Sequence, residues 1–427
     1  MNLIVTPGDG LVDEVPVIRV SDVNEGGEVS ITVEMDDAAA HPWRAEASFA
    51  ADGEGTVDTS TMSPTIGSWT GVDASGPWWS MDFMDEAVAP TAFTASDDAL
   101  LATVTATADG QTSRQQVWRR WRAPGVSVDH IEGDGFRSLV FLPDGTGSSP
   151  GVLVVPGSTG VSAMAPMAAL LASHGFVAAV VGYMEDEGLP ASLQEIPIEV
   201  IAAAMTALSG HGRCAAASIG IVCASVGTEG ALSALAHIEG CVSSATVAIA
   251  PSHVVWQALS AGGQPPKTAS WSMAGQPLPW VHMHGEKLLG QMLRHSIFDR
   301  FSRHPKPAAL HMRAAFEPAL ADTDAVAAAA IPVEQIAGPL MVVAGGDDAM
   351  WPSVAMANAI ATRRRKSGVG DDDAMLVFEH AGHFIRPPVT PTTVPWNDSV
   401  VSGGDPAAIA VAQTETWAKT LAFLRTT

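Results

Sequence analysis

The chain has 427 residues, and 47% of them are hydrophobic, which is enough for a large core and excludes a disordered or fibrous chain. It carries 22 Lys plus Arg against 46 Asp plus Glu, a formal net charge of −24. A field of that sign repels nucleic acid and anionic membranes, so we expect neither as a partner. The three cysteines, Cys214, Cys223 and Cys241, lack CxxC spacing, which disfavours a disulfide framework or a structural zinc site.

The sequence also indicates where in the cell the protein is found. The first residues lack a basic stretch followed by a long apolar run, and the most apolar segments are too short to cross a bilayer. We therefore expect a cytoplasmic protein. The pattern calls for no metal and no cofactor, and the oligomeric state is left open.

The residue pattern in the N-terminal part of the chain is typical of β-strands. Glu28–Glu34 and Leu101–Ala108 alternate apolar and polar residues with a period of two, and Gly, Asp and Pro interrupt such runs at short intervals. The pattern predicts an antiparallel β-sandwich domain over residues 1–133. Gly67–Met81 is rich in Gly and contains three Trp. We expect a loop packed between domains, and the alternative is a lip over an active site.

The residue pattern changes at about residue 135. Apolar segments of strand length alternate with segments of helical period, as in the strands expected at 136–142, 152–155, 177–181, 219–223, 340–343 and 375–379 and the helices expected at 164–174, 197–209, 228–236 and 406–424. The helix at 197–209 would carry Pro197 in its first turn. Residues 251–332 are less regular and predict an excursion above the sheet. Residues 134–427 are thus predicted to form one domain, a mostly parallel sheet with helices on both faces.

The strongest local motif is IGIVCASVGTEG, residues 219–230. An apolar strand runs into Ser225 and Gly227 and then into a helix, which is similar to the nucleophile elbow G-x-S-x-G, with Cys223 in the place of the first Gly. That turn is sharp, so its flanking positions must be small, and Cys is small enough. The helix N-terminus would favour negative charge that develops at Ser225.

Two further strand ends carry an acid and a base. PLMVVAGGDDAMWPS places Asp347 and Asp348 after a buried strand, and Asp348, four residues before Pro352, has the spacing usual for a hydrolase acid. MLVFEHAGHFIRPP places His380 and His383 after another strand. The A-G-H context favours His383 as the base, with His380 as its competitor.

The order Ser225, Asp348, His383 along the chain is that of the α/β-hydrolase triad, and each residue follows a predicted strand. An oxyanion hole needs two backbone donors. We expect the N–H of Val226 and the N–H of Ser158, with Gly157 and Thr159 as close rivals in the PGSTG loop.

Nearly the whole chain resembles the acyl-CoA thioesterase and bile acid-CoA:amino acid N-acyltransferase family. The likeness rests on PVIRVSDVNEGGEVSITVEMDD, HPWRAEASFAADGEGTVD and GSWTGVDASGPWWSM in the N-terminal domain. It continues in RRWRAPGVSVDHIEGDGFRSLVFLPDGTGSSPGVLVVPGSTGV, AAFEPALADTDAVAAAAIPVEQIAGP and HAGHFIRPP. Departures from the family pattern are Cys223 and Ala224 before the nucleophile, Val226 where Lys is common, and Pro251–Pro307, which has no close match.

The resemblance implies Ser225 as nucleophile, Asp348 as acid and His383 as base, acting on an acyl-CoA or a carrier-bound acyl thioester. The family's transferases carry Cys at the nucleophile position and its thioesterases carry Ser, so Ser225 favours hydrolysis. Cys223 lies two residues too early to be that Cys. The alternatives are N-acyl transfer to an amine or amino acid, and a carboxylesterase-type hydrolase.

Two other patterns have weaker functional interpretations. His282-x-His284 with Glu286 could hold a metal, but no further ligand spacing accompanies it. The run Arg363–Lys366, and Arg119, Arg120 and Arg122, could contact CoA phosphates. Alternatively, Arg363–Lys366 form the solvated end of a helix, where positive charge interacts favourably with the helix dipole. The same two interpretations apply to Arg119, Arg120 and Arg122.

Overall fold

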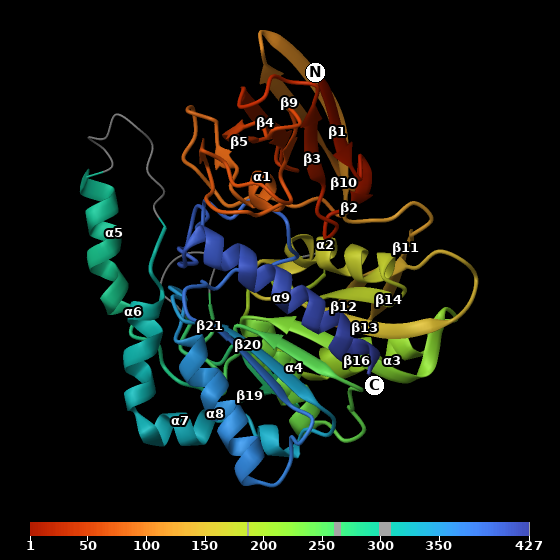
Figure 1. Cartoon of the computed structure of the whole chain (residues 1–427). Helices are drawn as coiled ribbons and strands as arrows, with labels where there is room; N and C mark the ends of the chain where they lie inside the picture. The colour runs from red at the N-terminus through yellow and green to blue at the C-terminus, as the bar shows by residue number, and fades with distance from the viewer. Residues whose placement is uncertain (186–187, 260–265, 299–308, 427) are drawn as a thin grey trace.

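The computed structural model describes residues 1–185, 188–259, 266–298 and 309–426, and its N-terminal part is a sandwich of two sheets (Figure 1). The smaller sheet has the order β1 (Asn2–Thr6), β3 (Val17–Ser21), β6 (Val57–Asp58). The larger has the order β2 (Asp9–Leu11), β10 (Gln111–Arg120), β9 (Ala99–Ala108), β4 (Glu28–Asp36), β5 (Pro42–Ala50), β7 (Ile66–Gly67), with β8 (Asp82–Phe83) on β5. Every pair except β2–β10 is antiparallel, so the predicted antiparallel sandwich is confirmed.

The C-terminal part is built on an eight-stranded sheet. Its order is β11 (Ser127–Gly133), β12 (Phe136–Leu142), β14 (Val177–Gly182), β13 (Ser149–Val155), β16 (Cys214–Ala224), β17 (Thr246–Ile249), β20 (Leu340–Gly345), β21 (Ala374–Phe378). The strands from β14 to β21 are parallel to one another, and β12 pairs antiparallel with both of its neighbours, β11 and β14. The predicted mostly parallel sheet is confirmed.

Helices cover both faces of this sheet, as predicted. The buried side chains of α2 (Gly160–Ser173) and α9 (Pro406–Arg425) pack with one face, together with sheet residues such as Val154 and Val222. The buried side chains of α3 (Glu199–Ser209), α4 (Val226–His237) and α8 (Ser353–Lys366) pack with the other face, together with alternate sheet residues such as Val155 and Ile221. Successive strand residues point to opposite faces, so these apolar strands are buried on both sides.

Strand β11 belongs to the sheet of the C-terminal domain, which affects where the domain boundary lies. It pairs with β12 along its whole length, from Ser127 opposite Leu142 to Gly133 opposite Phe136. A boundary at residue 133 would separate the two strands of one hairpin. We therefore propose that the boundary lies between Arg120, where β10 ends, and Ser127.

One helix begins later than predicted. Pro197 does not lie in its first turn, because Ile196 and Pro197 form the short strand β15, which pairs with β18 (Trp271–Met273) next to β19 (Gln276–Pro277). The N–H of Ile198 also donates to the carbonyl of Ser272, so α3 begins only at Glu199. Backbone pairing with a distant segment therefore outweighed the local preference of proline for a helix start.

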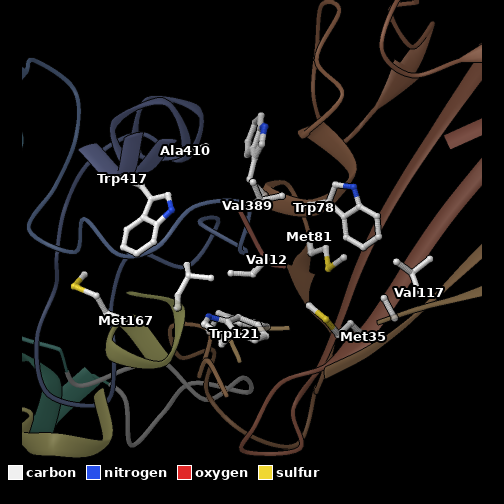
Figure 2. Close-up of a cluster of buried hydrophobic side chains, with 14 of the residues drawn as sticks. Val12, Met35, Trp78, Met81, Val117, Trp121, Met167, Val389, Ala410 and Trp417 are labelled. Atoms are coloured by element: carbon white, nitrogen blue, oxygen red, sulfur yellow. The ribbon is translucent and has the colours of Figure 1, made fainter. Parts of the chain in front are cut away.

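A continuous apolar cluster joins the N-terminal sandwich to α2 and α9. Figure 2 shows its side chains, with Met35 and Trp78 from the sandwich, Met167 from α2 and Trp417 from α9. Trp121, between the domains, is fully buried in the same cluster. The two domains therefore share a hydrophobic core rather than meeting at a polar surface.

The Trp-rich loop Gly67–Met81 packs between the domains. Its short helix α1 (Gly76–Trp79) is buried, as is Trp69. The carbonyl of Trp79 accepts a 3.0 Å hydrogen bond from the N–H of Thr392 in the C-terminal domain. The loop thus serves the packing role expected for it.

The excursion after β17 holds short helices at the edge of the sheet (Figure 1). They are α5 (Glu286–Phe298), α6 (Arg313–Phe316), the 3₁₀ turns η2 (Glu317–Ala321) and η3 (Val333–Gln335), and α7 (Thr323–Ala329). Residues 260–265 and 299–308 of this excursion lie outside the described residues. No helix among the described residues is long and apolar enough to cross a membrane.

Candidate active site

Ser225 occupies a sharp turn between β16 and α4. Its φ of 53° and ψ of −131° place a non-glycine residue in a backbone region that costs energy, and its N–H donates a 3.0 Å hydrogen bond to the carbonyl of Ile249. The strain is held by close packing on both sides of the serine. A Cβ at Gly227 would clash with the carbonyl oxygen of Pro156, and Cys223 is fully buried. The turn therefore presents the Ser225 hydroxyl at the carboxyl edge of the sheet.

Three side chains that follow strands of the same sheet form a chain of hydrogen bonds. Ser225 follows β16, Asp348 follows β20 and His383 follows β21. Nε2 of His383 lies 2.9 Å from Oγ of Ser225, and Nδ1 of His383 lies 2.8 Å from Oδ2 of Asp348. His383 and Asp348 are buried, so their contact is shielded from water. The arrangement can move a proton from the hydroxyl to the imidazole.

The buried carboxylate is fixed by the backbone around it. Oδ1 of Asp348 accepts hydrogen bonds from the N–H groups of Met350, at 2.8 Å, and Trp351, at 3.1 Å, which leaves Oδ2 for His383. The ring of Trp351 meets the His383 ring edge-on, with 5.5 Å between the ring centroids. The backbone N–H of His383 donates a hydrogen bond to the backbone carbonyl of Ser402. The imidazole is thus held from several directions.

The competing acid and base lie together, away from the serine. Nδ1 of His380 lies 3.2 Å from Oδ2 of Asp347, and both side chains are more than half exposed, at 64% and 55%. No hydrogen bond in the described part of the chain joins either of them to Ser225. Adjacent Asp residues and nearby His residues therefore form two separate pairs, one buried and one exposed.

The expected oxyanion donors are free to bind a ligand. Among the described residues the backbone N–H groups of Val226 and Ser158 make no hydrogen bond, as befits the first residue of a helix and a loop position. The PGSTG loop passes beside the serine, because a Cβ at Gly157 would lie 3.1 Å from Cβ of Ser225. Gly157 and Thr159 stay in the same short loop as rival donors.

A cavity of about 340 Å³ lies beside this site. Its walls include immediate chain neighbours of the site residues, namely Ala224, Thr159 and Phe384. The rest comes mainly from α2, from the segment after His383, from α9 and from residues 91–95 and Trp121 at the domain junction. Gly67–Met81 does not line it, so the alternative role of that loop as a lip has no support. The described part of Pro251–Pro307 does not line it either.

Two residues that the sequence analysis missed support the site. Arg313 donates hydrogen bonds of 3.2 Å to the carbonyls of Gly346 and Asp348 and pairs with Glu317, so it anchors the loop that holds the acid. Glu229 lies one turn into α4, fully buried. No local pattern marks either residue, because each acts through contacts with distant segments.

The environment of Glu229 changes its proton affinity. Oε2 accepts hydrogen bonds from the N–H of Trp256 and the hydroxyl of Ser270, and Oε1 has no partner among the described residues. Burial raises the pKa of Glu229 to about 8, and these two hydrogen bonds oppose the shift without cancelling it. The carboxyl behind the elbow is therefore held mainly in its neutral form at pH 7.

Several residues of the other patterns singled out in the sequence make contacts within the protein. Arg364 is buried against Asp373, Arg363 pairs with Glu334, and Arg119 is buried under the carbonyls of residues 11–14. These contacts favour a structural role over CoA phosphate binding. In the metal pattern, Nδ1 of His284 lies 3.0 Å from Glu286, and the described residues contain no group of three or more metal-ligand side chains.

Comparison with known proteins places the chain in a family. Residues 196–427 match the family described as BAAT / Acyl-CoA thioester hydrolase C terminal, and residues 13–133 match its counterpart, the Acyl-CoA thioester hydrolase/BAAT N-terminal region. The chain belongs to this family. The predicted family is confirmed, and with it the α/β-hydrolase fold class that the sheet and its helices display.

Relatives in this family carry two kinds of name. The chain is 27% identical to acyl-coenzyme A amino acid N-acyltransferase 2 of Rattus norvegicus, over 100% of this chain and 97% of that protein. It is 25% identical to acyl-coenzyme A thioesterase 6 of Mus musculus, over 90% of this chain and 86% of that protein. A solved alpha/beta hydrolase from a Medee basin deep-sea metagenome library aligns over 62% of this chain and 85% of its own, with 13% identity and a TM-score of 0.36.

Proposed function

We propose that this protein is a serine thioesterase that hydrolyses an acyl-CoA through an acyl-Ser225 intermediate. The observation that carries the proposal is the chain of short contacts from Ser225 through His383 to Asp348, in a member of the acyl-CoA thioester hydrolase/BAAT family. An enzyme of either branch, thioesterase or acyltransferase, would use the first half of this reaction.

The first half-reaction forms the acyl-enzyme. Nε2 of His383 accepts the hydroxyl proton as Oγ of Ser225 attacks the thioester carbonyl carbon. The negative charge that develops on the carbonyl oxygen is stabilised by the N–H groups of Val226 and Ser158. The carbon–sulfur bond then breaks, CoA leaves as a thiol with the proton from His383, and Asp348 stabilises the imidazolium between the two transfers.

The second half-reaction returns the enzyme to its starting state. His383 takes a proton from a water molecule, whose oxygen attacks the Ser225 ester, and the released Oγ regains a proton from the imidazole. An oxygen ester needs this activation of the incoming nucleophile, and water is small and abundant. Hydrolysis is therefore the expected fate of the acyl group unless the site excludes water or positions an amine.

Transfer to an amino acid is the second candidate. It is favoured by the relative named an amino acid N-acyltransferase, which aligns over the whole of this chain. The same acyl-Ser225 would then be attacked by an amine to give an amide. A carboxylesterase would use the same three residues, but membership of this family favours a thioester.

To test this function, the purified protein is incubated with a panel of acyl-CoAs, acyl-carrier thioesters and simple esters, with and without glycine or taurine. Free thiol and products are measured, the latter by mass spectrometry. We expect thiol release with free acid as the main product, and loss of turnover in Ser225→Ala. Ser63→Ala, an exposed serine of the sandwich, is the matched control. Mainly amide product would favour the transferase, and full activity in Ser225→Ala would overturn both assignments.

The cytoplasmic location stays a prediction. Two relatives from Mus musculus carry other compartments in their names, a peroxisomal succinyl-coenzyme A thioesterase and acyl-coenzyme A thioesterase 2, mitochondrial. Cell fractionation with an antibody to the native protein tests the location.

A further inference from the structure

Arg386 is the one charged residue among those that line the cavity beside Ser225, within the described part of the chain. It follows the base His383 by three positions, so the two Cα atoms are separated by no more than about 11 Å. Its guanidinium lies over the ring of Phe384, with 4.5 Å from Cζ to the ring centroid. A positive group therefore stands in the cavity wall, on the segment that also carries the base.

The charge of Arg386 has no acidic partner. No carboxylate of the described residues lies within ion-pair distance of it, in contrast to Arg313 or Arg364, which are each paired. Of its five N–H donors, one makes a hydrogen bond among the described residues, at 3.0 Å to the carbonyl of Phe93. Burial lowers the pKa of Arg386 to about 10, which still leaves it protonated at neutral pH. A partly buried cation without a counter-charge is costly unless a ligand supplies one.

The cavity wall around Arg386 is otherwise apolar or neutral. Trp121 is fully buried and lines the cavity, and its indole N–H has no hydrogen-bond partner among the described residues. Its ring stacks on Phe93, with 6.4 Å between the ring centroids, and Phe93 is the residue whose carbonyl holds Arg386. The remaining wall combines apolar side chains such as Met164 and Met167 with neutral polar ones such as Ser162 and Gln413. Unused donors in a wall that holds no carboxylate among the described residues favour a ligand with a negative charge.

We propose that Arg386 binds a carboxylate of the substrate inside this cavity. The proposal rests on the proposed function, because it assigns the substrate class of the same Ser225 site. A carboxylate fits the planar fork of a guanidinium through two parallel hydrogen bonds, which are stronger than bonds between neutral groups. The carboxylate could come from the distal end of a dicarboxylic acyl group on the donor, or from an amino acid that accepts the acyl group.

The test compares ligands that differ only in the carboxylate. For the donor, succinyl-CoA is compared with butyryl-CoA, in which a methyl group replaces the distal carboxylate. For the acceptor, glycine is compared with methylamine in the presence of butyryl-CoA. Each pair is measured with the wild-type protein, with Arg386→Gln and Arg386→Lys, and with Arg114→Gln as control, since Arg114 is an exposed arginine of the sandwich. Binding of the same ligands is measured with Ser225→Ala and with Ser225→Ala/Arg386→Gln.

We expect Arg386→Gln to lower kcat/KM about 10- to 100-fold for one carboxylate-bearing ligand and less than about twofold for its neutral partner. Arg386→Lys should lie between, because it keeps the charge without the fork. A loss confined to succinyl-CoA assigns the donor as the source, and a loss confined to glycine assigns the acceptor. Equal losses for charged and neutral ligands, or none, would overturn the proposal. If no acyl-CoA is cleaved, the proposed function fails, and tighter binding of a carboxylate-bearing ligand by Ser225→Ala than by the double variant still decides the role of Arg386.

Discussion

The indole Nε1 of Trp417 donates a 2.7 Å hydrogen bond to Oδ2 of Asp13, which joins α9 near the end of the chain to a loop of the N-terminal domain. Nε2 of His174, at the end of α2, lies 2.6 Å from the same oxygen. The helices that cover one face of the catalytic sheet are therefore tied to the sandwich through one nearly buried carboxylate. This contact makes the docking of the two domains sensitive to the charge of Asp13.

Replacing Asp13 by Asn should lower the free energy of unfolding at pH 7 by about 1–3 kcal/mol, because a charged acceptor of two hydrogen bonds is lost. Burial acts to raise the pKa of Asp13, but the hydrogen bonds from His174 and Trp417 outweigh it, so the net pKa is lowered. The stabilisation is therefore present above the unfolded pKa of about 3.8 and is lost as the pH falls through the lower folded value. Urea unfolding at pH 7 and at pH 3 measures it. Asp82→Asn, at an exposed position on β8, is the control, and an equal effect at both pH values would contradict the explanation.

Gly227→Ala should damage both the turn and its chemistry. The added Cβ meets the backbone carbonyl of Pro156, which cannot move without shifting the strand end that precedes the PGSTG loop. We expect the free energy of unfolding to fall by about 1–3 kcal/mol and kcat/KM for an acyl-CoA to fall by more than about tenfold. Thermal unfolding and thiol release measure the two effects. Gly212→Ala, where a Cβ has open space, should leave both near wild type.

The two neighbouring acids should separate cleanly by mutation. Asp348→Asn leaves the shape intact but removes the charge that orients His383, so kcat should fall by about 10²- to 10⁴-fold. Asp347→Asn touches only the exposed pair with His380 and should change kcat by less than about threefold. Steady-state kinetics of both variants settle the choice. Comparable losses in the two variants would mean that the buried pair is not the working one.

Glu229→Gln should change how stability depends on pH. Because burial raises the pKa of Glu229 to about 8, the folded protein keeps a proton that the unfolded chain releases above about pH 4.5. The contribution of Glu229 is thus fully present below pH 4.5 and is lost as the pH rises towards 8. The difference in unfolding free energy, wild type minus Glu229→Gln, should therefore fall by a few kcal/mol between pH 5 and pH 8. Chemical denaturation at both pH values measures this difference, and a pH-independent difference would refute the assignment.

The sequence predicted those features that depend on short-range pattern. Ser225, Asp348 and His383 could be selected because each follows an apolar strand in a recognisable turn, and the strand Phe136–Leu142 has the expected bounds. Features that depend on distant partners could not be predicted. Pro197, for example, lies in a strand because residues 271 and 272 offer it a partner.

The cavity beside Ser225 is another feature that depends on distant partners. Its walls combine residues 91–95 with segments of α2, α9 and the chain after His383, which no periodicity brings together. Arg386 follows the histidine loop like any surface arginine, and only the fold reveals that it faces a pocket without a carboxylate. The sequence alone does not show that Arg386 lacks an acidic partner, because the residues around it come from distant parts of the chain.

The thiols of this protein are placed where reagents do not reach them. Cys214, Cys223 and Cys241 are all buried and unpaired, and burial raises the pKa of each, that of Cys241 to about 11. Since the thiolate is the reactive form, the folded protein should react slowly with disulfides, peroxides and alkylating agents. An enzyme that releases a free thiol at every turnover would then be spared exchange with the disulfide that forms when this product is oxidised. For the experimenter, the colour developed by a disulfide reagent during turnover reports released CoA rather than the protein.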